Sequence, residues 1–238
     1  MNFITRLRLY SLTIPLLALM SVMLNQKGLN AQVPSPSAQP TMQFRTLGAD
    51  CAMDGLFYQM GSNNVSVSIP QQMRSMPYDY SGASPLEIFK LITDKDGKPV
   101  HQKIASVDIS QAGTFPLLVF FKGPKGPDQP IVSVLKEDAK AFPSGTFRIV
   151  NYSQNPLNAS FPSGPLVVPR GSIKEYQGNE GGIFPVGISE STPTGSNLVF
   201  NSNVGILPGK RIMFLVLPPS QPDGHVQIQR HNDGAPIR

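Results

Sequence analysis

Proline and glycine are spread along the whole chain, and they constrain its fold more than any other feature of the sequence. The 238 residues include 24 prolines and 21 glycines, which separate short runs of β-branched and aromatic residues. No window keeps a helical period of apolar residues for three turns, and a proline inside a helix breaks its hydrogen-bond ladder. Short strands tolerate such interruptions, so the sequence predicts an all-β protein.

Thirteen segments carry a strand pattern. Residues 65–69 alternate between apolar and serine side chains, as a strand with one buried face should. Residues 115–121 and 212–217 are almost wholly apolar, which predicts two central strands covered on both faces. The expected strands are 55–60, 64–69, 86–93, 100–109, 115–122, 131–135, 146–152, 166–168, 172–176, 182–188, 197–200, 211–217 and 226–230.

The second half of the chain repeats the first. A gap-free alignment matches Pro124, Pro127, Asp128, Ile131 and Asp138 with Pro219, Pro222, Asp223, Val226 and Asp233. Upstream, Phe57, Ser62, Asn64 and Pro70 match Phe147, Ser153, Asn155 and Pro162, and Tyr80, Gly82, Ile88 and Phe89 match Tyr176, Gly178, Ile183 and Phe184. Any two β units share apolar strands and proline turns, but the ordered polar matches favour an internal duplication. We therefore expect two tandem β-sandwich units of immunoglobulin-like size, over residues 43–140 and 141–238.

The N-terminus reads as an export signal. Arg6 and Arg8 precede an apolar run over 9–24, and a cut after Ala31 defines a signal peptide of residues 1–31. An uncleaved anchor is the alternative, although the run is short for a bilayer and contains Pro15. The proline-rich residues 32–42 are expected to form a flexible linker. These features predict a periplasmic or secreted protein with no membrane span after cleavage.

The charge balance argues against a nucleic-acid partner, and the cysteine content excludes an intramolecular disulfide. The chain has 20 Lys and Arg against 15 Asp and Glu, but Arg6, Arg8 and Lys27 lie in the predicted signal. The remainder is nearly balanced and carries no basic cluster, so nucleic acid is not an expected partner. Cys51 is the sole cysteine, which rules out an intramolecular disulfide and predicts a small free thiol, buried or partly exposed.

Motifs of catalysis and metal binding are missing from the sequence. There is no nucleophile elbow, zinc-protease or phosphate-loop motif, and no Cys-x-x-Cys pair. His225 and His231 are expected to be a surface pair rather than metal ligands, and His101 stands alone. Residues 94–97 (Asp-Lys-Asp-Gly) fit a hairpin turn better than a calcium loop. The sequence predicts neither an enzyme nor a cofactor.

Two segments are candidate binding surfaces. The proline-rich loops 122–130 and 218–224 include Lys122, Lys125, Asp128 and Asp223, and they are either binding tips or plain hairpin connections. The connection 73–80 includes Tyr78 and Tyr80, which either stack on a ligand or pack inside.

One segment carries a family resemblance. Residues 146–153 (Thr-Phe-Arg-Ile-Val-Asn-Tyr-Ser) are followed by Pro-Arg-Gly at 169–171. They resemble a strand and turn of uncharacterised secreted bacterial β-sandwich repeat proteins, and more distantly the periplasmic alginate O-acetylation factor. The resemblance implies an accessory role in the cell envelope and carries over no site.

The sequence leaves three functions open. The first is a non-enzymatic exported envelope protein that binds a protein partner or a polysaccharide or other polymer through loops or strand edges. The second is a carbohydrate-binding module, favoured if Tyr78, Tyr80 and Tyr152 form an exposed coplanar platform. The third is an enzyme, which would need a deep pocket where Asp or His residues converge.

Overall fold

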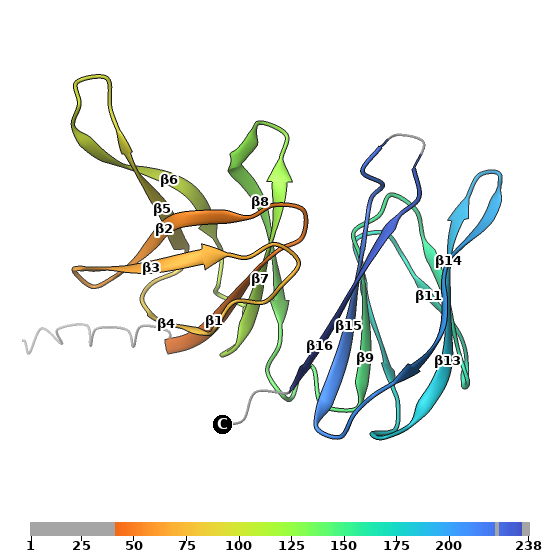
Figure 1. The fold of residues 1–238 in the computed structure, drawn as a ribbon. Coiled ribbons are helices and arrows are strands. Elements are labelled where there is room, and N and C mark those ends of the chain that lie inside the picture. Colours follow the sequence, from red (N-terminus) through yellow and green to blue (C-terminus); the bar gives the residue numbers. More distant parts are fainter. Residues whose placement is uncertain (1–40, 222–223, 235–238) are drawn as a thin grey trace, which may run out of the picture. The chain divides into compact units, whose positions relative to one another are not determined.

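The protein is all-β over the residues that the structure describes. A computed structural model describes residues 41–221 and 224–234, without the side chain of Pro127. Sixteen strands form four sheets of four strands each, and no helix occurs in this part of the chain (Figure 1). The prediction of two tandem β-sandwich units is confirmed.

The first sandwich contains two sheets with the strand orders β4-β1-β7-β8 and β3-β2-β5-β6. Its core includes Phe44, Tyr58, Ile88 and Phe120, each at most 1 % exposed. The strands are β1 (Thr41–Gly48), β2 (Met53–Met60), β3 (Asn63–Ile69), β4 (Tyr78–Ser81), β5 (Leu86–Thr93), β6 (Pro99–Val107), β7 (Pro116–Gly123) and β8 (Gly126–Lys136).

The second sandwich has the same plan, with the strand orders β12-β9-β15-β16 and β11-β10-β13-β14. Its core includes Phe147, Ile149, Ile188 and Phe214, all fully buried. The strands are β9 (Thr146–Asn151), β10 (Leu157–Phe161), β11 (Gly164–Val168), β12 (Ile173–Gln177), β13 (Ile183–Thr192), β14 (Gly195–Gly205), β15 (Lys210–Leu217) and β16 (Gln227–Gly234).

Each strand of the first sandwich has an equivalent in the second, which confirms a duplicated architecture. The first strand of each unit pairs in parallel with the penultimate one, β1 with β7 and β9 with β15. A bulge interrupts β5–β6 directly after Ile88 and β13–β14 directly after Ile188. Two such irregularities at the same place fix the register between the units, because a bulge is a specific local feature.

This register corrects most of the sequence alignment. The shared bulge aligns Ile88 with Ile188 and Phe89 with Ser189, so the matches of Ile88 and Phe89 with Ile183 and Phe184 are wrong. Phe57 lies in β2 and Phe147 in β9, which occupy different sheets, so their match is wrong; the equivalent of Phe147 is Phe44 in β1. The gap-free match of the C-terminal hairpins is also shifted, since it aligns Leu117, which faces outward from the first core, with Ile212, which faces into the second core. A one-residue shift is easily missed in apolar strands, because both faces are hydrophobic.

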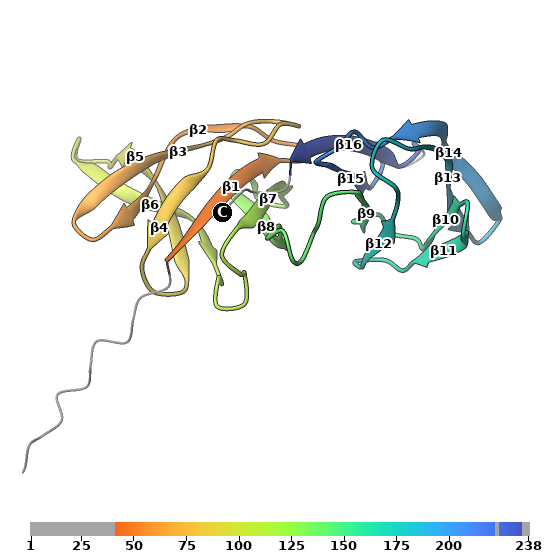
Figure 2. The ribbon, with the colours of Figure 1, turned by 90° about the horizontal axis from the view of Figure 1, so that it is seen from below.

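A third hydrophobic cluster joins the two sandwiches. Leu47, Leu117 and Val119 of the first unit pack with Met213 and Leu215 of the second, and all five are fully buried. Strands β7 and β15 are therefore covered on both faces, as their apolar runs predict. Figure 2 shows β1 and β16 next to each other at this junction, where Arg45 Nη1 donates to Asp233 Oδ1 over 3.3 Å.

Three strands and two boundaries differ from the sequence prediction. Strands β1, β4 and β10 were not expected; each is short or alternates with polar residues. The flexible linker predicted for 32–42 is wrong at its end, since Thr41 begins β1 and Met42 is buried. The rest of the linker and the predicted signal peptide lie outside the described residues. The predicted loop 122–130 is mostly strand, with only Pro124 and Lys125 between β7 and β8.

Candidate functional site

The free thiol is an unreactive core group. Cys51 is buried, and its Sγ lies 3.6 Å from the carbonyl oxygen of Phe120 as a hydrogen-bond donor. Burial, reinforced by the negative charge of Asp50, raises the pKa of the thiol to about 11. A thiolate is the reactive form of cysteine, so this residue is a poor nucleophile at neutral pH.

The histidines form neither a surface pair nor a metal site. His225 is exposed, but His231 lies in β16 with 8 % of its surface exposed, so the predicted surface pair is wrong. Burial, together with the positive charge of Arg74, lowers the pKa of His231 to about 4. Within the described ranges, no group of three His, Cys, Asp or Glu residues is placed to hold a metal ion.

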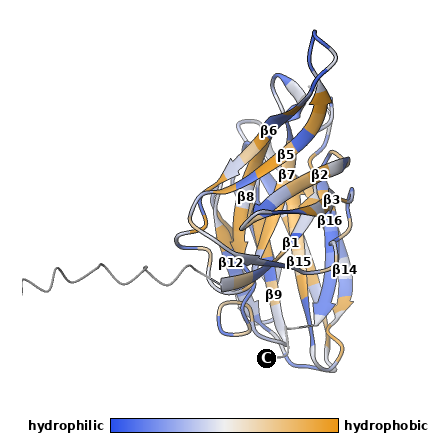
Figure 3. Cartoon of the chain, turned by 90° about the vertical axis from the view of Figure 1, so that its left-hand side faces the viewer, coloured by the Kyte–Doolittle hydropathy of each residue, from blue (hydrophilic) through white to orange (hydrophobic). Residues whose placement is uncertain are grey.

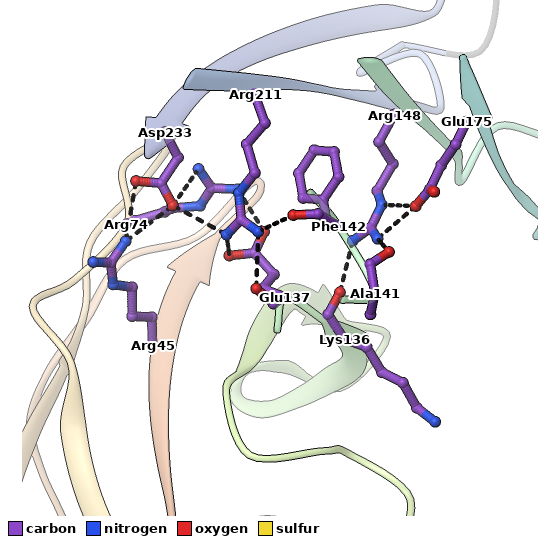
Figure 4. Close-up of polar contacts among 10 residues, drawn as sticks. All are labelled: Arg45, Arg74, Lys136, Glu137, Ala141, Phe142, Arg148, Glu175, Arg211 and Asp233. Atoms are coloured by element: carbon purple, nitrogen blue, oxygen red, sulfur yellow. Dashed lines mark hydrogen bonds and ion pairs between the residues drawn. The ribbon is translucent and has the colours of Figure 1, made fainter. Parts of the chain in front are cut away.

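Buried charges converge at the junction of the sandwiches (Figure 4). The fully buried Arg211 donates through Nη1 to the carbonyl oxygens of Glu137, at 2.8 Å, and Phe142, at 2.6 Å. Arg74 Nη2 lies 2.6 Å from Glu137 Oε1, and Arg211 Nη2 lies 3.4 Å from both Glu137 Oε2 and Asp233 Oδ2. Each carboxylate is held by two or more guanidinium groups, so neither is free to act as a base.

The junction network also holds the connection between the two units. Figure 4 shows the Phe142 ring between Arg148 and Arg211, whose guanidinium carbons lie 3.9 and 4.5 Å from its centroid. Arg148 also donates to the carbonyl oxygens of Lys136 and Ala141, at 2.8 and 2.9 Å. These contacts fix residues 136–142 by charge-assisted hydrogen bonds and cation–π packing, which is a structural role.

The residues predicted for the proline-rich loops do not form one site. Lys122 and Lys125 are exposed, and the backbone N–H of Lys122 donates to Asp50 Oδ1 at 2.7 Å. Asp128 lies in β8 and pairs with Lys90 of β5 at 3.3 Å, where both side chains are largely exposed. Such a surface pair contributes roughly 0–1 kcal/mol. Asp223 lies outside the described residues.

The three tyrosines do not form the exposed platform that would favour the carbohydrate-binding prediction. Tyr80 is 6 % exposed and donates to the carbonyl oxygen of Ala83 at 2.8 Å. Tyr78 packs against the first core, and its hydroxyl accepts from the backbone N–H of Ser68. Tyr152 lies at the junction and donates to Ser133 Oγ at 2.9 Å; burial raises its pKa to about 12. The two tyrosines of β4 face inward because they occupy alternate positions of one strand.

The best-formed candidate site lies on the outer face of the sheet β3-β2-β5-β6. Phe57 stacks on Phe89 with 5.8 Å between ring centroids, and His101 meets Phe57 edge-on at 4.8 Å. A hollow of about 490 Å³ beside them is lined by Phe57, Asn64, Ser66, Leu91 and His101, among others. Phe89 also borders a second hollow of about 400 Å³, which is lined mainly by residues 80–85 at the end of β4 and in the connection to β5. We call Phe57, Phe89, Leu91 and His101 the aromatic patch.

The second sandwich shows that the fold does not require this patch. The shared bulge makes Phe57, Phe89, Leu91 and His101 equivalent to Asn158, Ser189, Ser191 and Ser196. In the second unit, Asn158 Nδ2 donates instead to Ser191 Oγ at 2.7 Å, and the exposed apolar residues of that outer face include Val167 and Leu198, which pair with Asn158 and Ser189. Leu91 is 57 % exposed, although burying a leucine is favourable by about 1.5–3 kcal/mol. The patch is therefore a feature of the first unit alone.

Sequence reasoning missed both the patch and the junction network. Phe89 and Leu91 stand in an apolar run, whose outward-facing members cannot be told from core residues without the register. Arg211 lies at the start of the apolar strand β15 and Asp233 in the polar strand β16, and nothing in the sequence marks the two charges as buried or as partners.

The comparisons with known proteins add no assignment. Within the part of the chain that the structure describes, no helix has the length and apolar character needed to cross a membrane. No family model matches the chain, and no curated protein is significantly similar to it in sequence.

Proposed function

We propose that this protein is an exported, non-catalytic accessory protein of the cell envelope that binds a polysaccharide chain on the outer face of its first sandwich. The observation that carries the proposal is the aromatic patch, because the duplicated unit replaces all four of its residues with small polar ones. The first unit exposes Leu91 and His101 to solvent at positions where the second unit has serines. A ligand that covers this surface best explains the difference.

The chemistry of the patch suits sugar rings. Aromatic faces pack on the apolar faces of sugars, while nearby amide and hydroxyl groups satisfy their hydroxyls. Here Phe89 supplies the ring, and Asn64, Ser66 and His101 supply polar groups around the adjoining hollow.

The carboxylates and the thiol support a binding role rather than catalysis. Glu137 and Asp233 are held by arginines, and burial raises the pKa of Cys51 well above neutral pH. Glycoside hydrolysis needs two free carboxyl groups flanking one bond. On the patch the nearest carboxylate, Glu87, pairs with Lys103 at 2.9 Å.

The first test is a pull-down from the envelope fraction of the host with tagged protein, followed by analysis of both polysaccharide and protein. Each patch residue is replaced by its equivalent in the second unit, as Phe89→Ser or His101→Ser. We expect enriched polysaccharide with the wild type and roughly a two- to tenfold loss with Phe89→Ser, because stacking on one aromatic ring contributes about 0.5–1.5 kcal/mol beyond area burial, and about 1.4 kcal/mol is a factor of ten.

Ser189→Ala provides the matched control, because Ser189 holds the equivalent position in the second unit. It should bind as the wild type does. Enrichment of a stoichiometric protein that Phe89→Ser releases would move the ligand from polysaccharide to protein while keeping the site. Binding that is equal in all variants would refute the aromatic patch as the binding surface.

A further inference from the structure

The edge strand β14 lacks the protection that its equivalent β6 carries. Both lie at the edge of a four-stranded sheet. The eleven residues of β14 contain no charge and no proline, whereas β6 starts at Pro99 and includes Lys103. Free edges pair readily with other strands, and charges or prolines are the usual protection. Figure 3 colours much of β14 as hydrophilic.

The lysine that protects β6 has an apolar equivalent in β14. Phe89 of β5 pairs with Lys103, and the equivalent Ser189 of β13 pairs with Leu198. Leu198 thus replaces the lysine and is 67 % exposed. At the far end of the same hairpin, Ile183 is 75 % exposed and pairs with Gly205. The edge is therefore flanked by exposed apolar side chains at both ends.

The remaining uncharged edge of the first unit is protected in another way. Strand β3 also lacks charged residues, but Tyr78 accepts from the backbone N–H of Ser68 at 3.1 Å. Thr46 Oγ1 donates to the carbonyl oxygen of the same residue at 2.6 Å. No comparable side-chain contact protects the centre of β14 among the described residues.

We propose that β14 pairs antiparallel with β14 of a second copy of this chain to form a twofold-symmetric dimer. An uncharged strand meets its own copy without like-charge repulsion, and a twofold interface uses one surface twice. A pairing centred on Ser202, with the bulge at Val199 kept, places Leu198 of one copy opposite Gly205 of the other. Leu198 then lies beside Ile183, so the two exposed side chains cover each other at both ends of the interface.

Sedimentation velocity of the purified protein over a hundredfold concentration range tests the proposal. We expect a concentration-dependent dimer, and Leu198→Lys, which restores the residue of the first unit, should weaken dimerisation at least tenfold. Ser202→Lys at the centre of the edge should do the same. Ile131→Lys is the control: Ile131 is 57 % exposed on β8 of the first unit, outside the aromatic patch, so a charge there should leave the dimer unchanged.

A wild type that stays monomeric at every concentration overturns the proposal, whatever else binds at this edge. A dimer that survives both Leu198→Lys and Ser202→Lys overturns it as well. The thermal unfolding midpoint of each variant, expected within a few degrees of the wild type, separates lost pairing from lost folding. The polysaccharide site is tested by other variants, so either proposal can fail without the other.

Discussion

At the scale of single residues, the most consequential side chain is Arg211. It is fully buried and holds two carbonyl oxygens and two carboxylates that come from the connection between the units and from β16 of the second sandwich. A buried ion pair adds little net stability, but removal of one partner leaves the other charge unpaired in a low-dielectric interior. The effect of a substitution therefore depends on what is left behind.

Arg211→Ala should reduce the free energy of unfolding by about 3–5 kcal/mol, because Glu137 and two carbonyl groups lose their donor. Urea unfolding followed by circular dichroism measures the change. Lys103→Ala provides the comparison, since it removes an exposed ion pair with Glu87 and should cost less than about 1 kcal/mol. Equal effects of the two substitutions would show that the junction network is not stabilising.

His231 should make stability depend on pH. Its pKa is lowered from 6.5 to about 4 in the folded state, so the unfolded chain binds more protons between these values. Stability is therefore complete above about pH 6.5 and falls as the pH drops to 4, by up to about 3 kcal/mol. Unfolding curves at several pH values measure this slope.

His231→Leu should flatten the slope between pH 6.5 and 4, while His225→Gln, at an exposed position, should not change it. Carboxylates also contribute to the pH dependence of stability, toward the acidic end of this range. Hydrogen bonds lower the pKa values of Asp108 and Glu180. The comparison of variants with the wild type removes their common contribution. An unchanged slope in His231→Leu would mean that His231 is protonated in the folded state.

At the scale of strands, the sequence was sufficient for class and order but not for register. Alternation in 65–69 and the apolar runs of β7 and β15 identified strands, because burial on one or two faces leaves different patterns. The match of Phe57 with Phe147 failed, since aromatic residues occupy both the inner face of β9 and the outer face of β2. Polar strands such as β1 and β10 lack long apolar runs and were missed for that reason.

The candidate site depended on the register even more strongly. Tyr78 and Tyr80 looked like loop residues, but β4 turns Tyr80 into the core, and Phe89 of an apolar run turns out to face outward. Which face a strand residue takes is decided by pairing with distant segments, and local sequence does not contain that information. The duplication supplies part of this information, because the strand register of one unit predicts which residues face outward in the other.

At the scale of the whole molecule, the shared cluster around Leu117 and Met213 should make the two sandwiches unfold together. Differential scanning calorimetry should give one transition, with the calorimetric enthalpy close to the van't Hoff enthalpy. Leu215→Asp, which places a charge in the shared cluster, should lower the midpoint strongly. Ser189→Asp, on the outer face of β13, should change the free energy of unfolding by less than about 0.5 kcal/mol and therefore shift the midpoint little. Two separate transitions in the wild type would contradict this coupling.

The connection between the repeats has a consequence for how this protein can evolve. Tandem domains are commonly recombined or spaced apart because the segment between them is a passive tether. Here that segment supplies Glu137 and Phe142. Glu137 pairs with Arg74 of the first unit and Arg211 of the second, and the ring of Phe142 lies between Arg148 and Arg211 of the second unit. An insertion in this segment would remove both residues from their partners. Separation of the two units would likewise leave the arginines of the junction without Glu137, so the two repeats can no longer be recombined as independent domains.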